Sequence, residues 1–166
     1  LYLLQRILLE GGKSLPDFPD MPVPQRDWGA YSDNPYIAEQ LTQYDPDVES
    51  EQAHQLIALM NADQRTAFDA IIASVNARDG QLFFLNGPGG TGKTFIYKAL
   101  CHCLRAESSI VLCVASSGIA ALLLPGGRTS HSTFRIPIDN LTDASSCSIS
   151  KQSLRADMLR MVRLIV

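Results

Sequence analysis

The pattern of apolar and polar residues predicts an amphipathic helix early in the second third of the chain. Four apolar residues recur at the spacing i, i+3, i+4 and i+7, which places them on one face of a helix: Phe68, Ile71, Ile72 and Val75. Asn61 is a favourable N-cap, and Gln64 follows three residues later, as in a capping box. The predicted helix therefore begins at Asn61 and ends before Gly80.

The remaining apolar runs alternate between strand and helix patterns. Predicted strands cover residues 81–85, 109–115 and 162–166, and predicted helices cover residues 94–105, 119–124 and 151–160, with an irregular loop over 126–150. The run at 109–115 is continuously apolar, as in strands of parallel sheets that are buried on both faces. This alternation predicts a three-layer α/β fold with a parallel sheet.

Prolines divide the chain into two parts. Six of the nine prolines fall between Pro16 and Pro46, and proline is excluded from helix interiors and central strands. We therefore expect residues 1–55 to form an acidic, irregular lead segment with a short helix at residues 1–9. The compact domain is expected to cover residues 56–166.

Composition and charge narrow the range of possible partners. The 166 residues are 46% hydrophobic, enough for one core. Residues 1–60 carry 3 basic and 10 acidic side chains, whereas residues 61–166 carry 11 basic and 7 acidic. The second part therefore suits a polyanionic ligand. The longest apolar runs are too short to span a bilayer, so no membrane partner is expected, and the sequence leaves the oligomeric state open.

The four cysteines are Cys101, Cys103, Cys113 and Cys147. Cys101 and Cys103 flank a histidine, but positions i and i+2 of a helix point to different faces. We therefore expect the reduced thiols of an intracellular protein and not a zinc site.

Residues 87–94 carry the most specific chemistry in the chain. They read Gly-Pro-Gly-Gly-Thr-Gly-Lys-Thr, between a predicted strand and a predicted helix, which is the pattern of a phosphate-binding P-loop. The predicted ATP-binding residues are Gly87, Gly89, Gly90, Thr91, Gly92, Lys93 and Thr94. Lys93 can reach the β- and γ-phosphates, and the Thr94 hydroxyl can bind Mg²⁺.

A second block separates the classes of P-loop protein. The segment from Ala115 to Phe134, Ala-Ser-Ser-Gly-Ile-Ala-Ala-Leu-Leu-Leu-Pro-Gly-Gly-Arg-Thr-Ser-His-Ser-Thr-Phe, resembles motif Ia of the petite-integration-frequency (PIF) DNA helicases and especially of their Helitron-transposon relatives. Residues 59–64 are similar to the Q motif of this family, and residues 83–94 are similar to its motif I. The resemblance is strong from about residue 50 onward.

The resemblance implies a RecA-like P-loop NTPase lobe in a superfamily-one helicase that moves 5′ to 3′ on single-stranded DNA. It implies catalytic roles for Lys93 and Thr94 and an adenine contact for Gln64, whose amide can also serve only as the partner of the Asn61 cap. It further implies nuclear residence and work in DNA repair, recombination, telomere maintenance or transposition.

The same block supplies candidate DNA contacts. Ser116, Ser117 and Gly118 follow a predicted strand, where hydroxyl and backbone donors suit phosphate oxygens. Three residues of the next loop add a cation, a donor and a ring that can stack on a base: Arg128, His131 and Phe134. Phe134 can equally anchor the loop to the core.

In this family, the strand that contains Leu164 leads into the acidic Walker B pair, and the sequence stops at Val166, just short of those acids. We therefore expect this N-terminal fragment to bind Mg-nucleotide weakly without hydrolysing it or unwinding DNA. Two other interpretations stay open. One is a different P-loop ATPase, such as an AAA-type or RecD-like protein, and the other is a non-catalytic binding remnant of a transposon.

Overall fold

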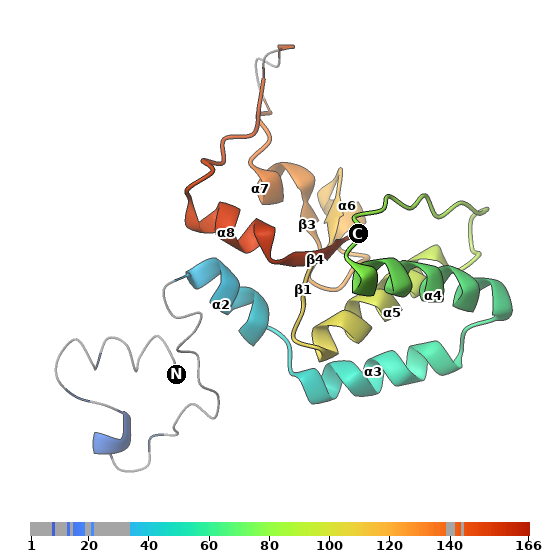
Figure 1. Ribbon diagram of the computed structural model, residues 1–166, viewed down its shortest axis with the longest axis horizontal. Helices are drawn as coiled ribbons and strands as arrows, with labels where there is room; N and C mark the ends of the chain where they lie inside the picture. Colours follow the sequence, from blue (N-terminus) through green and yellow to red (C-terminus); the bar gives the residue numbers. More distant parts are fainter. Residues whose placement is uncertain are drawn as a thin grey trace.

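The computed structural model describes residues 8, 13, 15–18, 21, 34–138, 142–143 and 145–166 (Figure 1). The helix predicted at residues 1–9 lies outside this part except for residue 8. The only element described before residue 34 is a 3-10 turn, η1 (Leu15–Asp17). Among the described residues, no helix is both long enough and apolar enough to cross a bilayer.

Two short parallel sheets lie at the centre of the described chain. Strand β1 (Ile110–Leu112) pairs with β4 (Val162–Ile165), and β2 (Val114–Ala115) pairs with β3 (Arg128–Thr129). The predicted parallel pairing is therefore confirmed, and the predicted strand at 109–115 is divided at Cys113. These two-stranded sheets are compatible with a P-loop helicase domain, and the RecA-like sandwich stays a prediction.

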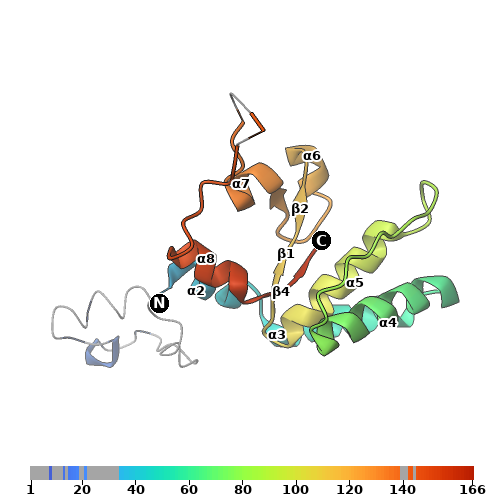
Figure 2. The same cartoon turned by 45° about the horizontal axis from the view of Figure 1, so that its top comes forward.

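Helices cover both faces of β1. Successive side chains of a strand point to opposite faces, so β1 contributes to two cores. Val111 packs in a core with apolar residues of α4 (Ala62–Ala77) and α5 (Lys93–Ala106). Ile110 and Leu112 pack in a second core with Ile37 of α2 (Pro35–Thr42) and Met158 of α8 (Leu154–Arg160). Figure 2 shows these two helix pairs on either side of β1 and β4.

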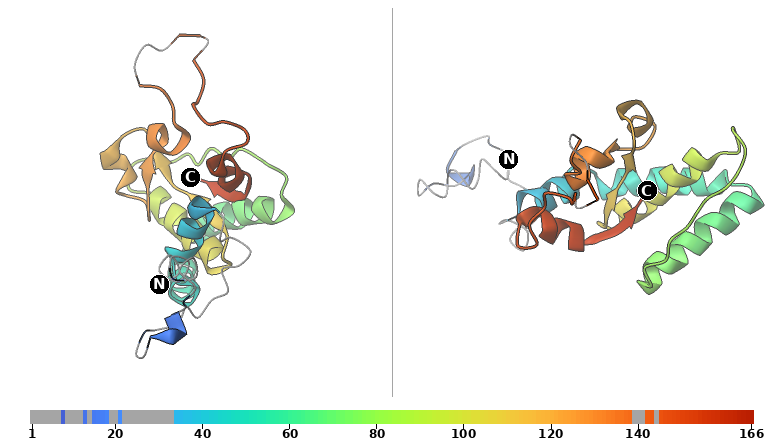
Figure 3. Two further views of the ribbon diagram at one scale, coloured as in Figure 1. Left: turned by 90° about the vertical axis from the view of Figure 1, so that its left-hand side faces the viewer. Right: turned by 90° about the horizontal axis from the view of Figure 1, so that it is seen from above.

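Helix α5 is the central helix of the larger core. Helices α3 (Pro46–Ala58) and α4 flank it, as Figures 1 and 3 show. The predicted start of α4 is confirmed. The Asn61 side chain accepts a hydrogen bond from the Gln64 amide at 2.9 Å, and the Gln64 side chain accepts one from the Asn61 amide at 3.1 Å.

The prediction of an irregular segment up to residue 55 is wrong for residues 35–42, which form α2, and for residues 46–55, which belong to α3. Pro35 and Pro46 occupy first helical positions, where a missing N–H leaves no hydrogen bond unmade. Asn34 and Asp45 cap the two helices through their side chains. The boundary expected between residues 55 and 56 therefore falls inside a helix.

Two further local predictions need correction. Residues 81–85 are irregular and not a strand, because they pair with no strand in the described part of the chain, and Leu82, Phe83 and Phe84 are exposed. The region 126–150 is not wholly irregular, because it contains β3 and α7 (Ser130–Phe134). The short helix predicted at 119–124 is α6 (Gly118–Ala121).

Candidate functional site

The P-loop, residues 87–94, turns sharply into the N-terminus of α5. Gly90 and Gly92 have φ values of +79° and +87°, a region that favours glycine. A Cβ atom on Gly92 would lie 2.5 Å from Gln64 Nε2. Gly92 is the N-cap of α5 and accepts a hydrogen bond from the Ile96 amide at 3.1 Å. Glycine at positions 90 and 92 therefore suits the path of the backbone.

Lys93 is the first residue of α5, and its side chain folds back over the P-loop. Its Nζ atom donates to the backbone oxygens of Gly87 at 2.7 Å and Pro88 at 2.8 Å. No carboxylate in the described residues lies within ion-pair distance of Nζ. The ammonium is therefore held at the loop by neutral carbonyls, and an anionic phosphate oxygen is a stronger partner than a carbonyl.

The two threonines of the P-loop have different surroundings. Thr91 Oγ1 donates to the Pro88 oxygen at 2.9 Å, and a Cβ atom on Gly87 would lie 2.8 Å from that hydroxyl. Thr94 is the second residue of α5 and is half-buried beside Lys93. A hydroxyl at this position offers the hard oxygen ligand that Mg²⁺ prefers.

Gln64 links α4 to the P-loop. Its Nε2 atom donates to the Thr91 backbone oxygen at 3.1 Å, while its Oε1 atom accepts from the Asn61 amide. The Gln64 side chain therefore takes part in the cap of α4 and contacts the P-loop at the same time. The adenine contact implied by the family resemblance stays a prediction.

The predicted DNA-contacting segment follows β2. Ser116, Ser117 and Gly118 are all exposed. The Ser117 hydroxyl accepts a hydrogen bond from the Ala120 amide at 3.3 Å and caps α6. The Ser116 side chain is the freer of the two hydroxyls to meet a phosphate.

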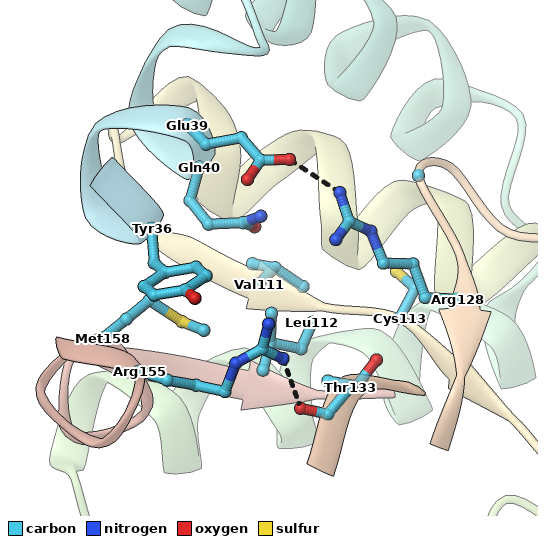
Figure 4. A pocket seen from close by; sticks show the side chains of 11 residues that line it. Tyr36, Glu39, Gln40, Val111, Leu112, Cys113, Arg128, Thr133, Arg155 and Met158 are labelled. Atoms are coloured by element: carbon cyan, nitrogen blue, oxygen red, sulfur yellow. Dashed lines mark hydrogen bonds and ion pairs between the residues drawn. The ribbon is translucent and has the colours of Figure 1, made fainter. Parts of the chain in front are cut away.

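The other three candidates lie in β3 and α7. Arg128 is about half exposed, and its Nη2 atom lies 2.7 Å from Oε1 of Glu39 on α2 (Figure 4). His131 is half-buried in α7. Phe134 packs against the smaller core, so the anchoring role that the sequence left open accounts for its position. Stacking of Phe134 on a base stays a prediction.

Sequence reasoning did not identify two residues beside Arg128. Glu39 is separated from Arg128 by 89 positions, and no local pattern marks it. Arg155 of α8 lies with its guanidinium carbon 4.8 Å from the centre of the Tyr36 ring, and its Nη1 atom donates to the Thr133 oxygen at 3.1 Å. Figure 4 shows both arginines at the same cavity, between α2, α8 and β3.

The structure does not gather all the predicted site residues at one point. The nucleotide candidates lie in the P-loop, at the N-terminus of α5 and, for Gln64, in α4, whereas the DNA candidates lie after β2, in β3 and in α7. The chain connecting them runs through α5, β1 and Cys113. Arg128 is hydrogen-bonded to this connecting segment, because its backbone amide donates to the Cys113 backbone oxygen at 3.0 Å.

The sequence of this chain is similar to those of known proteins. A family model described as PIF1-like helicase matches residues 59–166. An ATP-dependent DNA helicase PIF4 of Trypanosoma brucei brucei (strain 927/4 GUTat10.1) is 32% identical over 110 residues, which are 64% of this chain and 13% of that protein. An ATP-dependent DNA helicase Pif1 of Psychrobacter sp. (strain PRwf-1) is 34% identical over 104 residues, 62% of this chain and 15% of that protein.

Proposed function

This chain belongs to the PIF1-like helicase family, and from this premise we propose that it is the nucleotide-binding part of an ATP-dependent DNA helicase. The observation that carries the proposal is the P-loop, where the Lys93 ammonium, two backbone carbonyls and the start of α5 meet. The relatives' names support ATP use and action on DNA.

In this proposal, the P-loop binds the phosphates of ATP. The Lys93 ammonium leaves the carbonyls of Gly87 and Pro88 for phosphate oxygens, because a charge-assisted hydrogen bond is stronger than a neutral one. The backbone amides at the start of α5, a helix of 14 residues, add donors and a favourable helix dipole. In phosphoryl transfer, such positioning and charge stabilisation supply nearly all of the catalysis that the protein provides.

The residues present also fit a magnesium ion. Thr94 would hold it through its hydroxyl oxygen, next to the phosphates that Lys93 binds. When bound, the ion would neutralise part of the charge of the phosphates. The role of this chain is then to orient the triphosphate so that the hydroxyl and the ammonium act on neighbouring oxygens.

We also propose that single-stranded DNA binds along the segment after β2. The exposed hydroxyl of Ser116 supports this, as does the half-exposed guanidinium of Arg128. Such groups bind the DNA backbone without reading its sequence. His131 and Phe134 lie in α7, directly after Arg128, and complete the proposed surface.

The finer assignments of the proposal rest on the family resemblance. They are membership in the Helitron-like subgroup, 5′-to-3′ polarity, work in repair, recombination, telomere maintenance or transposition, and residence in the nucleus. Of the two relatives above, one comes from a trypanosome, a eukaryote, and the other from a bacterium. The proposal of nuclear residence applies to a eukaryotic protein.

The test is titration of the purified chain with a fluorescent ATP analogue and Mg²⁺. Lys93→Ala should weaken binding by about tenfold or more, since a hydrogen bond to a charged group is worth about 1.5–3 kcal/mol. Lys98→Ala is the matched control, because Lys98 is an exposed lysine on the same helix. Equal affinities of the two variants would overturn the nucleotide site. DNA binding that is insensitive to both ATP and Lys93 would favour a non-catalytic binding module.

A further inference from the structure

Two buried thiols face each other across the larger core. Cys101 of α5 and Cys113, directly after β1, have their Sγ atoms 3.1 Å apart, and both are free thiols that are almost wholly buried. Cys103 and Cys147 are also free thiols. Within the described residues, no group of three or more potential metal ligands includes this pair.

A buried cation lies against one of the two sulfurs. Arg105 is 5% exposed, and its Nη2 atom lies 3.8 Å from the Cys113 Sγ atom. That nitrogen is positioned by the Pro125 oxygen at 3.0 Å, and the guanidinium stacks on the Tyr44 ring at 3.9 Å. In the described part of the chain, Nε and Nη1 of Arg105 have no hydrogen-bond partner. A negative charge on Cys113 would therefore compensate a buried positive charge.

The pKa shifts of the two thiols agree with this arrangement. The hydrogen bond from Cys101 and the neighbouring Arg105 guanidinium lower the pKa of Cys113, although burial opposes them. The same hydrogen bond, together with burial, raises the pKa of Cys101. Because the Arg105 guanidinium lies against the Cys113 sulfur, a thiolate is more favourable at Cys113 than at Cys101, and a protonated Cys101 can donate its hydrogen bond to it.

Cys113 is one of the residues that line a cavity between α2, α8 and β3. Cys113 lines this cavity of about 40 Å³ together with Val111, Leu112 and Arg128 (Figure 4). A single water needs roughly 10–15 Å³ measured in this way, so a molecule with two oxygen atoms fits. Cys101 has no exposed surface and does not line this cavity, and its sulfur lies 3.1 Å from that of Cys113.

We propose that Cys113 and Cys101 form a peroxide-sensitive thiol pair that closes into an intramolecular disulfide between α5 and the end of β1. The Cys113 thiolate attacks one oxygen of hydrogen peroxide, so an S–O bond forms and the O–O bond breaks. The departing hydroxide takes a proton from solvent and leaves as water. Cys113 is then a sulfenic acid.

Cys101 completes the reaction. Its sulfur attacks the Cys113 sulfur, the S–S bond forms, and the S–O bond breaks. The thiol proton of Cys101 leaves with that oxygen as a second water. The peroxide is reduced to two waters, and the two thiols lose two electrons and two protons. The cross-link joins the helix that begins at Lys93 to the strand that leads toward Ser116, and thiol reductants reverse it.

The test is peptide mass mapping of the whole 166-residue chain after treatment with hydrogen peroxide and alkylation of the remaining thiols. A Cys101–Cys113 peptide lighter by two hydrogen atoms is expected, with Cys103 and Cys147 alkylated. The double variant C103S/C147S is the control that leaves the pair intact, and it should give the same product. A cross-link involving Cys103 or Cys147, or oxidation of Cys147 alone in the wild-type chain, would overturn the proposal.

Single variants test the order of the steps. In Cys101→Ser, the reaction should stop at a Cys113 sulfenic acid that a 1,3-dicarbonyl reagent traps. In Cys113→Ser, Cys101 should not react. Trapping at Cys101 in that variant, with the fold verified by circular dichroism, would contradict the order. Because the wild-type chain and C103S/C147S retain both buried sulfurs, the cross-link itself is tested even if a single variant misfolds.

Discussion

Gln64 Nε2 donates a hydrogen bond to the Thr91 backbone oxygen at 3.1 Å, so the first turn of α4 is attached directly to the nucleotide loop. The same amide group closes the capping box with Asn61. One side chain therefore caps the start of α4 and restrains the P-loop, so we expect a residue outside the glycine-rich loop to affect nucleotide affinity.

We predict that Gln64→Ala weakens nucleotide binding, whereas Asn61→Ala does not. Both variants lose part of the cap and should each lower the free energy of unfolding by about 1 kcal/mol. Only Gln64→Ala loses the contact with Thr91. Because this contact does not involve the base, ATP and GTP affinities should fall by the same factor in a titration. A loss confined to ATP would show that adenine contact, and not the restraint on the P-loop, dominates.

A second prediction concerns the glycines of the P-loop. Gly92→Ala should destabilise the chain by about 1–2 kcal/mol, because Gly92 has a left-handed φ and the new Cβ would meet Gln64. Gly89→Ala is the control, since no atom lies within 4 Å of a Cβ built there. Urea unfolding should separate the two variants, and equal midpoints would contradict the backbone path described for the loop.

The elements that were predicted correctly are encoded by local patterns in the sequence. Helix α4 has a capping box at its start and an apolar face of period 3.6, and both are encoded within residues 61–75. Strand β4 is a short apolar run that follows α8. In these segments the hydrophobic pattern, the cap and the final packing agree, so sequence reasoning was sufficient.

The features that the sequence did not predict correctly depend on distant residues or on the exact position of a residue in its element. The proline content of residues 16–46 predicts no helix, but Pro35 and Pro46 stand at first helical positions, where proline is compatible with α2 and α3. The strand at 81–85 was wrongly predicted because strand formation requires a neighbour. Leu82 and Phe83 instead line a groove together with residues of β4. The pairing of Arg128 with Glu39 spans 89 positions and has no local signal.

The corrected N-terminal part leads to a third prediction, about helix caps. Asn34 caps α2 and is buried, and its Nδ2 atom donates to the Leu154 oxygen at 2.7 Å, which attaches α2 to the start of α8. Asp45 caps α3 at an exposed position. Asn34→Ala should therefore cost about 1 kcal/mol more than Asp45→Ala in urea unfolding, for the additional buried hydrogen bond. Similar costs would show that the contact with Leu154 contributes little.

A fourth prediction concerns the proposed DNA surface. Glu39 neutralises Arg128, so DNA phosphates must compete with a carboxylate for the guanidinium. Arg128→Gln should weaken binding of single-stranded DNA and reduce the dependence of log affinity on log salt by about 0.7 for the lost contact. Glu39→Gln should strengthen binding. Fluorescence anisotropy with a labelled oligonucleotide measures both effects, and if neither variant changes affinity, Arg128 is not a DNA contact.

The last prediction concerns alkaline pH. Burial raises the pKa of the Tyr44 hydroxyl, and the neighbouring Arg105 guanidinium opposes this only in part. In the unfolded chain a tyrosine ionises near about pH 10, so above that pH the unfolded state binds fewer protons than the folded state. The stability linked to Tyr44 is therefore fully present below pH 10 and is lost as the pH rises through the raised folded pKa.

Tyr44→Phe isolates this contribution. The variant keeps the aromatic ring on which Arg105 stacks, at 3.9 Å, and removes only the ionisable group. Urea unfolding from about pH 9 to 11 should show a steeper loss of stability for the wild-type chain than for the variant. Parallel pH profiles would mean that the Tyr44 hydroxyl is as well solvated in the folded chain as in the unfolded one, contrary to the packing of the Tyr44 ring against Arg105 of α5.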